Sequence, residues 1–507
     1  MQTIQEHGAD ARWTADTLRA CTAACFGEGS LIVVANRAPV RYEHGADGRL
    51  IARRASGGLV TALQPIVAAS RGVWVAHDDD PVARCRAAEA PPGGDDAYRI
   101  RPVHLSAQQQ RGYYHGFANE GLWPLCHHVH VRPIFRSQDF ADYRTANARF
   151  ADAACEEADA STALILVQDY HLALAPKMIR HRRPLGTIVS FWHVPFPPAR
   201  QFAICPWARQ LVDGLLGSSI AGFQTPEDCR NFIETAEAML GADISEPGAV
   251  SYGGRRTIVR AYPASVEWPE AGEIDAPSIA ACRADVQRRY GLPADFQLIV
   301  GVDRLDYTKG LEEKLLVFER LLDWRREFRG RLVLLQVASP SRTTLPAYRA
   351  MRAKLVRTAE RINQRFGAPG YRPIVLVEKA LEAPEVNGLL RAADVCYVGS
   401  LHDGMNLVAK EFVVARDDHR GVLVLSQFAG AMHELRSALI INPYDVDTSA
   451  RVLARALRMP PAEQAHAMRQ MRAVVAQANG YRWAGEMVTD AAFLRQESYS
   501  LGLASSG

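Results

Sequence analysis

The chain has 507 residues, of which 48% are hydrophobic and 23% are charged. This composition excludes disordered and fibrous classes, and the length is enough for two large domains with full cores. The formal net charge of +3, from 59 basic and 56 acidic residues, argues against partners such as nucleic acid or a membrane surface, so any anionic ligand must be bound by local groups.

Cysteine usage and hydropathy predict the compartment. No apolar run approaches the roughly 20 residues that span a bilayer, and the first residues do not combine a basic region with an apolar one. Nine scattered cysteines, an odd number, fit reduced thiols better than a disulfide framework. We therefore expect a cytoplasmic protein, whose oligomeric state the sequence leaves open between a monomer and a homo-oligomer.

The first part of the chain predicts a tail and a strand. Residues 1–28 are polar and small and are expected to form an N-terminal tail or a first helix outside the core. The apolar run 31–34 predicts a buried strand that ends in a polar loop with Arg37. A hairpin-like segment at 42–51 leads to glycines that end at Gly58, before a helical run. Such glycines let a ligand approach the backbone, although glycines in turns are more often only turns.

The next strand, at 72–77, ends in the three aspartates 78–80. Consecutive carboxylates are compatible with a metal site, but Pro81 makes a solvated loop the simpler interpretation, and we expect no metal ion. Aromatic side chains follow at Tyr114 and Trp123, where they suit either the apolar face of a sugar ring or core packing. The histidines at 127, 128 and 130 are predicted on a strand, in a role other than metal ligation.

A repeated pattern organises the middle of the amino-terminal half. The apolar runs 164–167 and 187–192 end in polar residues, Asp169 and His193 among them, and each is followed by a helical run. This alternation indicates parallel βαβ units, which collect ligand-binding groups along one edge of a sheet. Asp169 and His193 are therefore expected to face the same cleft.

The pattern breaks near 262–269, and a second series of strands and helices begins. We expect an α/β protein with two doubly wound, Rossmann-like domains that face each other across a cleft. The predicted divisions are a tail, an amino-terminal domain, a carboxy-terminal domain and a final helix that packs back on the amino-terminal domain, at 1–28, 29–264, 265–480 and 481–507.

The cationic residues of the expected site lie in this second series of strands and helices. Arg304 and Lys309 directly follow a buried strand and are placed to hold a diphosphate and to neutralise a departing nucleoside diphosphate without a metal ion. In the alternative, Arg304 forms an ion pair with Asp303 or Asp306. Arg342 follows the next strand and could meet a second, separate phosphate.

The segment 401–411 supplies a main-chain site. A strand leads into a turn with Gly404 and then into a helix, whose first backbone N–H groups form a phosphate site. Asp403 in the turn can accept hydrogen bonds from sugar hydroxyls, and Glu411, about two turns into the helix, can reach a ribose. The alternative is an ordinary turn with a helix-capping aspartate.

These motifs together resemble the trehalose-6-phosphate synthase family, from about residue 31 to residue 490. The residues that carry the resemblance are Asn36-Arg37, Ser56-Gly-Gly58, Leu122-Trp-Pro124, Asp169-Tyr-His171, His193-Val-Pro-Phe-Pro197, Gly222-Phe-Gln-Thr225, Arg304-Leu-Asp-Tyr-Thr-Lys-Gly310, Asp403 to Glu411, Ser426 to Gly430 and Asn442-Pro-Tyr-Asp445. The resemblance implies a GT-B fold, transfer of glucose from UDP-glucose to a phosphorylated acceptor with retention of configuration, and no required metal or other cofactor.

The resemblance also implies roles for single residues. Arg304 and Lys309 match residues that hold the donor diphosphate, and Asp169 and His193 complete the expected catalytic group. The donor is expected to contact Gly58, His193, Asp403, Gly404, the amides of Met405, Asn406, Leu407 and Val408, and Glu411. Glucose 6-phosphate is expected to contact Arg37, Tyr114, Trp123, Asp169 and Arg342.

The sequence departs from the family pattern near the acceptor. The usual Trp-x-Gly-Trp-Ser-Gly appears as Trp74-Val-Ala-His77-Asp-Asp79, and Gln168 stands where the family commonly has His. Trp74 and His77 are assigned to the acceptor side, and His77 opens the alternative of another phosphorylated acceptor, such as glycerol 3-phosphate. A non-catalytic sugar-nucleotide sensor is a further alternative. A dinucleotide dehydrogenase is disfavoured because no Gly-x-Gly-x-x-Gly follows the first strand.

Overall fold

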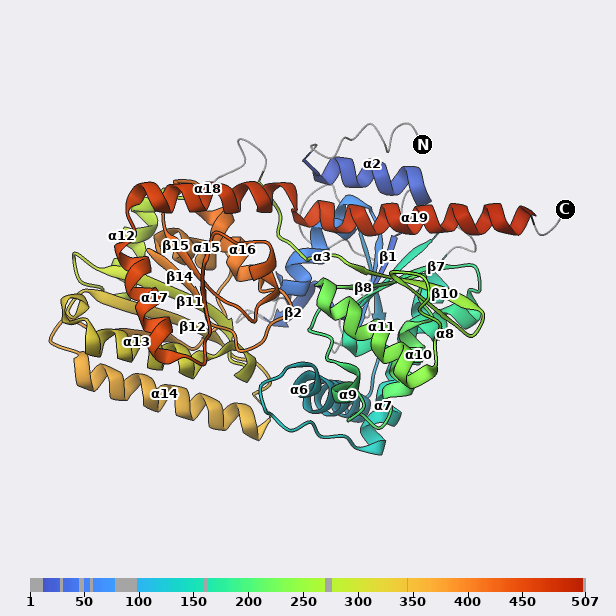
Figure 1. Cartoon of the computed structure of the whole chain (residues 1–507), viewed down its shortest axis with the longest axis horizontal. Helices are drawn as coiled ribbons and strands as arrows, with labels where there is room; N and C mark the ends of the chain where they lie inside the picture. Colours follow the sequence, from blue (N-terminus) through green and yellow to red (C-terminus); the bar gives the residue numbers. More distant parts are fainter. Residues whose placement is uncertain are drawn as a thin grey trace. The chain divides into compact units, whose positions relative to one another are not determined.

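The structure is a computed structural model that describes residues 12–27, 31–44, 50–54, 58–77, 98–158, 163–269, 276–343 and 345–504. The chain forms two compact units, the first made of Met1–Glu267 with Gln477–Gly507 and the second of Trp268–Ala476 (Figure 1). Both changes of unit lie a few residues from the predicted divisions at 264/265 and 480/481. Among the described residues, no helix combines the length and the apolar character needed to cross a membrane.

The first unit is built on an eight-stranded sheet with the order β5-β4-β1-β6-β7-β8-β10-β9. All neighbours pair in parallel except β9 and β10, which are antiparallel. The strands are β1 (Leu31–Arg37), β4 (Val73–His77), β5 (Arg99–Val103), β6 (Leu164–Gln168), β7 (Thr187–Phe191), β8 (Ile220–Phe223), β9 (Ala249–Tyr252) and β10 (Arg255–Ala261). A separate hairpin pairs β2 (Val40–His44) with β3 (Leu50–Arg54).

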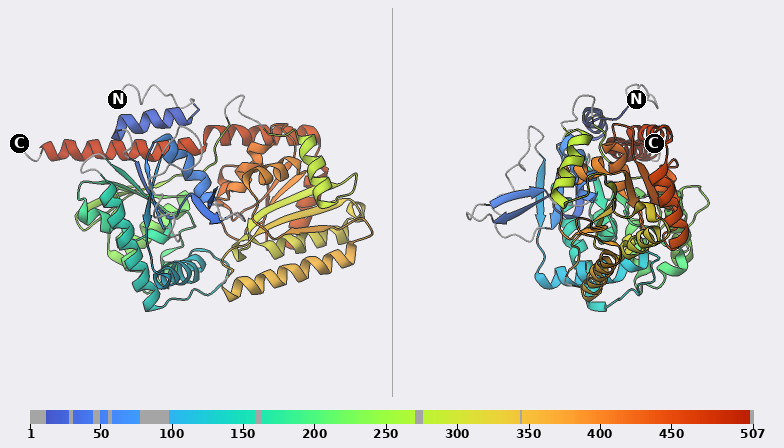
Figure 2. Two further views of the ribbon diagram at one scale, coloured as in Figure 1. Left: turned by 180° about the vertical axis from the view of Figure 1, so that it is seen from behind. Right: turned by 90° about the vertical axis from the view of Figure 1, so that its left-hand side faces the viewer.

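Two groups of helices pack on this sheet. One contains α2, α3 and α19, and the other contains α7, α8, α10 and α11; α3 and α7 both contact β1. Both views in Figure 2 show α2 beside the long α19. The helices are α2 (Ala15–Phe26), α3 (Gly58–Ala69), α5 (Ala107–Gln110), α6 (Trp123–Cys126), α7 (Ser137–Glu157), α8 (Ala175–Arg182), α9 (Ala199–Phe202), α10 (Ala208–Leu215), α11 (Pro226–Leu240) and α19 (Gly480–Ala504).

The amino-terminal segment contains the helix α2, one of the two predicted alternatives, but this helix is capped and has a buried face, so it does not lie outside the core. Thr14 caps its first turn, and Leu18, Thr22 and Phe26 are buried. At the other end of the chain, α19 is held by Asp490, whose carboxylate accepts hydrogen bonds from Arg260 and Tyr262. The two ends of the chain therefore complete one face of the first unit.

The predicted strand at the histidines is wrong. α6 ends at Cys126, and His127, His128 and His130 lie in an irregular loop, where His130 has a φ of 58°. Val129 and Val131 alternate with the histidines as they would in a strand, but none of the described strands pairs with this segment. Tyr114 lies in η1 (Arg111–Leu122), a π-helical segment that continues into α6.

The second unit is built on a six-stranded, fully parallel sheet with the order β13-β12-β11-β14-β15-β16. The strands are β11 (Gln297–Arg304), β12 (Leu332–Ser339), β13 (Ile374–Val377), β14 (Val395–Val398), β15 (Val422–Ser426) and β16 (Leu439–Ile441). The apolar runs of β11, β12, β14 and β15 are buried, as expected of central strands covered on both faces, whereas the edge strands β13 and β16 are partly exposed. The strands that the sequence predicted before Arg304, before Arg342 and before the turn at 401–411 are β11, β12 and β14.

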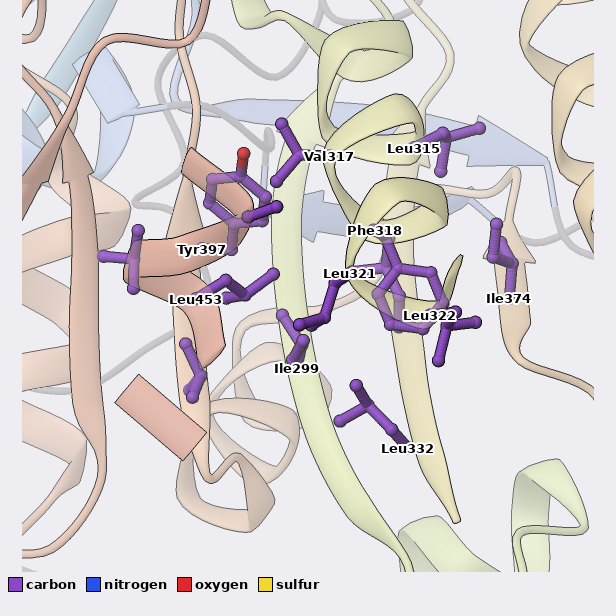
Figure 3. Packing of buried hydrophobic residues seen from close by; sticks show 14 of the residues in the cluster. Ile299, Leu315, Val317, Phe318, Leu321, Leu322, Leu332, Ile374, Tyr397 and Leu453 are labelled. Atoms are coloured by element: carbon purple, nitrogen blue, oxygen red, sulfur yellow. The ribbon is translucent and has the colours of Figure 1, made fainter. Parts of the chain in front are cut away.

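Helices of the second unit form two groups, α13 with α14 and α17, and α12 with α15 and α16. Figure 3 shows α13 packing Phe318 and Leu321 toward Ile299 of β11, within a core cluster of buried aliphatic and aromatic side chains. The helices are α12 (Ile279–Tyr290), α13 (Leu311–Trp324), α14 (Pro346–Phe366), α15 (Ala383–Ala392), α16 (Leu407–Ala415), α17 (Val446–Arg458) and α18 (Pro461–Gln477), with short 3₁₀ turns η3 (Tyr307–Lys309), η4 (Arg326–Phe328) and η5 (Gly430–His433).

Gly310 links two loops of the second unit at the carboxyl edge of its sheet. Its φ is 59°, and a Cβ atom at this position would lie 2.2 Å from the carbonyl oxygen of Gly399. A side chain here would combine left-handed strain with a backbone clash. The close approach of the loops after β11 and β14 therefore requires glycine.

We expect Gly310→Ala to lower the free energy of unfolding by more than about 2 kcal/mol, because strain and clash add. Gly291→Ala is a matched control, since Gly291 has a φ of 62° but no neighbouring atom within 4 Å of the place that a Cβ atom would take. Gly291→Ala should lower the free energy of unfolding by about 1 kcal/mol. Calorimetric unfolding of both variants gives the comparison, and equal losses would contradict the role of the Gly399 contact.

Candidate active site

The donor side of the expected site lies at the carboxyl edge of the second sheet. β11 ends at Arg304, and η3 places Lys309 one residue before Gly310. The ammonium of Lys309 lies 2.5 Å from Oδ2 of Asp403, which follows β14, and both side chains are largely buried. The fold thus brings together a cation and a carboxylate that are 94 positions apart in the sequence.

The turn before α16 presents main-chain groups and is fixed by side chains. Asn406 caps the helix: its φ is 79°, and its Oδ1 accepts a hydrogen bond from the amide of Ala409. The Oδ2 atom of Asp403 also accepts from Asn406 Nδ2 at 3.0 Å and from Ser400 Oγ at 3.1 Å. The first amides of α16, including Leu407 and Val408, therefore have a rigid setting in which to bind an anion.

The carbonyl groups at the carboxyl end of α16 accept hydrogen bonds from two arginines. Arg472 donates to the carbonyl groups of Val413 and Val414, and Arg391 donates to that of Ala415. Guanidinium groups at a helix carboxyl terminus offset its partial negative charge. Both ends of this helix are therefore held, and its amino-terminal amides are left in a fixed orientation.

Glu411 is the fifth residue of α16, so it lies one turn into the helix rather than the predicted two. Burial raises the pKa of Glu411 to about 7. A carboxyl group with such a raised pKa is partly protonated near neutral pH, and hydroxyl groups that donate hydrogen bonds to it favour its ionised form. This is the property that a ribose-binding carboxylate needs.

The two aspartates beside Arg304 pair with other cations. Asp303 binds the ammonium of Lys314 at 2.5 Å, inside the core, and Asp306 binds the guanidinium of Arg342. Burial by itself raises the pKa of Asp306, but the charges of Arg342 and Arg304 outweigh it and hold the pKa below its usual value. Arg304, Lys309 and Arg342 all follow strands at the same edge, as predicted from their positions in the sequence.

The acceptor side of the expected site lies in the first unit, where a chain of contacts joins four segments. Arg37 at the end of β1 donates to the hydroxyl of Tyr114, and the Tyr114 ring stacks on His171 with centroids 5.6 Å apart. His171 Nδ1 lies 3.4 Å from a carboxylate oxygen of Asp169. Asp169 in turn accepts a hydrogen bond from the amide of His193 at 3.2 Å.

Asp169 adopts an unusual backbone conformation, with a φ of 75°. Its carboxylate caps η2 (Tyr170–Leu172) through the amide of Tyr170. Burial raises its pKa, but the hydrogen bond and charge from His171 and the hydrogen bond from the amide of Tyr170 act in the opposite direction, and the pKa of Asp169 is lowered. Strained residues of this kind are concentrated at functional sites.

His193 is held in one orientation as a neutral ring. Burial lowers the pKa of His193 to about 4, even though the charge of Asp169 acts in the opposite direction. Its Nε2 lies 2.6 Å from Oε1 of Gln168, which is fully buried at the end of β6. Gln168 faces Nε2 with its amide oxygen, which only accepts, so this orientation of the amide corresponds to a proton on Nε2 and a lone pair on Nδ1.

The remaining predicted residues of the first unit have different surroundings. Trp74 is fully buried and donates its indole N–H to the carbonyl of Arg37, so the structure places it behind Arg37, as a support for that strand end. His77 ends β4, with Nδ1 2.9 Å from the carbonyl oxygen of Val103. Trp123 packs its ring against His127 and Tyr170. Gly58 is the first residue of α3, while the aspartates 78–80 lie outside the described residues.

Comparison with known proteins decides the family. The sequence profile of Glycosyltransferase family 20 matches residues 29–492. The chain belongs to this family. A trehalose-6-phosphate synthase of Mycobacterium sp. (strain JLS) is 38% identical over 472 residues, which cover 90% of this chain and 95% of the relative.

Solved structures of the family share the fold. A trehalose-6-phosphate protein from E. coli bound with UDP-2-fluoro glucose has a TM-score of 0.79 at 30% identity and covers 91% of this chain and 98% of its own. An alpha,alpha-trehalose-phosphate synthase (UDP-forming) from Burkholderia xenovorans in complex with glucose-6-phosphate has a TM-score of 0.79 at 32% identity, over 91% of this chain and 100% of its own. The two Rossmann-like units of this family 20 glycosyltransferase are therefore those of the GT-B fold.

Three residues of this glycosyltransferase matter to the geometry but were not among the predicted site residues. They are Gln168 beside His193, His171 between Tyr114 and Asp169, and Asp306 beside Arg342. Each of the three lies in or beside a motif that the sequence analysis identified. Their roles could not be read from those motifs, because each role depends on a partner that is distant in the sequence. Within the part of the chain that the structure describes, no group of three or more His, Cys, Asp or Glu side chains could hold a metal ion.

The contact between Gln168 and His193 gives a testable charge effect. We expect Gln168→Glu to raise the pKa of His193, because a carboxylate at Nε2 stabilises the imidazolium. Gln168→Met, which is neutral and of similar length, should leave the pKa low. Histidine-labelled NMR across pH 4–8, with the signal assigned by His193→Gln, measures the change. The same pKa in the Glu and Met variants would rule out the contact.

Proposed function

We propose that this chain is a retaining glycosyltransferase that moves glucose from UDP-glucose to glucose 6-phosphate, giving α,α-trehalose 6-phosphate and UDP. The observation that carries the proposal is the grouping of Arg304, Lys309, Asp403 and the α16 amides at one sheet edge. A diphosphate linked to a sugar and a ribose fits this set of groups. The names of the relatives described above agree with it.

On the donor side, the diphosphate would be held by Arg304, Lys309 and the amides from Met405 to Val408. Lys309 can shift its ammonium from Asp403 toward phosphate while it stays near the carboxylate, since an ammonium has three donors. Asp403 would then accept from glucose hydroxyls, and Glu411 from the ribose. His193 offers its Nδ1 lone pair to a hydroxyl of the same glucose.

On the acceptor side, Arg37 and Tyr114 are already joined by a hydrogen bond and would bind glucose 6-phosphate together with Arg342. Arginine suits this task because its planar fork binds phosphate through paired hydrogen bonds. Asp169 and Trp123 would contact the sugar ring through a hydroxyl group and an apolar face.

Retention of configuration follows if the acceptor attacks from the face that UDP leaves. In this hypothesis the leaving phosphate oxygen takes the proton of the acceptor hydroxyl, the bond from the anomeric carbon to that phosphate oxygen breaks, and the new glycosidic bond forms on the same side. Arg304 and Lys309 stabilise the negative charge that develops on the diphosphate. These cations would fill the role that a divalent ion has elsewhere, so we propose a metal-independent reaction in the cytosol.

A second acceptor class is favoured by one observation. His77, where the family pattern has Trp, replaces a large aromatic face with a smaller ring whose Nδ1–H is directed to the carbonyl of Val103. In this proposal a smaller phosphorylated acceptor, such as glycerol 3-phosphate, takes the place of glucose 6-phosphate.

A UDP-release assay separates these functions. With UDP-glucose as donor, we expect glucose 6-phosphate to give at least about tenfold higher kcat/KM than glycerol 3-phosphate, with EDTA causing no loss. Arg304→Ala should lower kcat by about 100-fold or more, in the range that loss of an electrostatic stabiliser produces. A preference for glycerol 3-phosphate would select the second acceptor, and no release with any acceptor would favour a sensor.

Donor affinity should depend on pH through Glu411. The free protein protonates Glu411 below about pH 7, whereas ribose hydroxyls favour the carboxylate, so donor binding releases a proton. Affinity for UDP-glucose should therefore rise about tenfold from pH 6 to pH 8 and then level off. Glu411→Gln should bind more weakly with a flat profile. Titration calorimetry in buffers of differing ionisation enthalpy measures both, and a pH-independent wild type would remove Glu411 from the ribose site.

A further inference from the structure

Asp306 makes contacts that reach beyond its own loop. It lies between β11 and η3 and is fully buried. Its Oδ1 accepts a hydrogen bond from the amide of Thr308 at 3.1 Å. Its Oδ2 accepts one from Arg342 Nη1 at 2.5 Å and one from the hydroxyl of Tyr348 at 3.1 Å. One carboxylate thus joins the loop after β11, the loop after β12 and the first turn of α14.

Arg342 is fixed by this arrangement. Its side chain is 4% exposed, its backbone has a φ of 48°, and its Nη1 also lies 2.6 Å from the hydroxyl of Tyr348. Two partners on the same nitrogen set both the position and the plane of the guanidinium. The orientation of that plane decides where paired hydrogen bonds to a phosphate can form.

Asp306 also lies on the loop that carries the other cations. Its main-chain carbonyl accepts a hydrogen bond from the amide of Lys309 at 3.1 Å, and Arg304 is two positions earlier in the chain. A buried carboxylate is costly to desolvate and needs several hydrogen bonds to compensate, which Asp306 has. The same residue therefore contacts both the loop of the diphosphate cations and the arginine of the separate phosphate.

We propose that Asp306 is a positioning residue for the phosphate of the acceptor. It orients Arg342 through the Nη1 contact and sets its place relative to Arg304 and Lys309. The inference deepens the proposed function and rests on it, because that function assigns the acceptor phosphate to Arg342. Tyr348 assists by holding the same nitrogen.

The test compares glucose 6-phosphate with unphosphorylated glucose as acceptors for UDP-glucose. Asp306→Asn keeps the size of the side chain and the acceptor for Thr308, but it removes the charge and turns an NH₂ group toward Arg342. The kcat/KM preference for the phosphorylated acceptor should fall at least about tenfold, mainly through KM. The Kd of UDP should change less than about threefold, a result that a general structural disturbance would not produce.

Arg342→Ala and the double variant complete a thermodynamic cycle. If Asp306 acts through Arg342, the loss of phosphate preference in the double variant should equal that in Arg342→Ala, because the second change has nothing left to orient. If the double variant instead loses phosphate preference by the product of the two single-variant factors, the inference is overturned. Unchanged phosphate preference in Arg342→Ala would instead overturn the assignment of Arg342 in the proposed function.

Tyr348→Phe keeps the experiment decisive if Asp306→Asn fails to fold. It retains the ring and the carboxylate and removes only the hydroxyl that shares Nη1. We expect a fall of about threefold in phosphate preference with the UDP Kd unchanged. Val317 lies in the core rather than in this group, so Val317→Ala is a control for destabilisation alone and should lower stability without changing the preference. Equal preferences in Tyr348→Phe and wild type would contradict the positioning role.

Discussion

The parallel arrangement of strands is the constraint on which the site depends. In a parallel sheet all strands end at the same edge, so residues that follow different strands meet in space although they are far apart in the sequence. β11, β12 and β14 pair side by side in the order β12-β11-β14, which brings Arg304, Lys309, Arg342 and Asp403 to one edge. The buried aliphatic core beneath these strands fixes their register, and the register fixes the spacing of the charges.

Charge compensation explains how several cations can be held there before an anion binds. Lys309 pairs with Asp403, Arg342 with Asp306, and Lys314 with Asp303. An uncompensated buried cation would be costly, whereas each pair recovers much of the desolvation energy through short charged hydrogen bonds. The cations are therefore oriented in advance, and an incoming phosphate exchanges or shares partners instead of ordering flexible side chains.

The sequence predicted those parts of the fold that depend on local pattern. The buried strands of both sheets have continuous apolar runs, whereas β5, β9 and β10 were not predicted. Arginines interrupt the apolar residues of β5 and β10, β9 has only four residues, and β5 and β9 are the edge strands of their sheet. The strand proposed at His127 to His130 was wrong although Val129 and Val131 alternate with the histidines there, because alternation does not show whether a neighbouring strand is available for pairing. The pairs Lys309–Asp403 and Asp306–Arg342 could not be predicted, because they depend on which strands are neighbours.

The departures from the family pattern are not scattered, and their positions locate where this chain differs. His77 ends β4 and Gln168 ends β6, and these strands are the two neighbours of β1, whose last residue is Arg37. His77 is the register partner of Arg37 itself. The second unit, by contrast, carries each of the family residues that were matched to the donor there. Because the chemistry of a parallel sheet edge is set by the residues at neighbouring strand ends, His77 alters the surroundings of Arg37, while Gln168 contacts His193. Under the proposed function, a change of acceptor can therefore arise around Arg37 in the first unit, while Arg342 and the groups that stabilise the departing diphosphate stay the same.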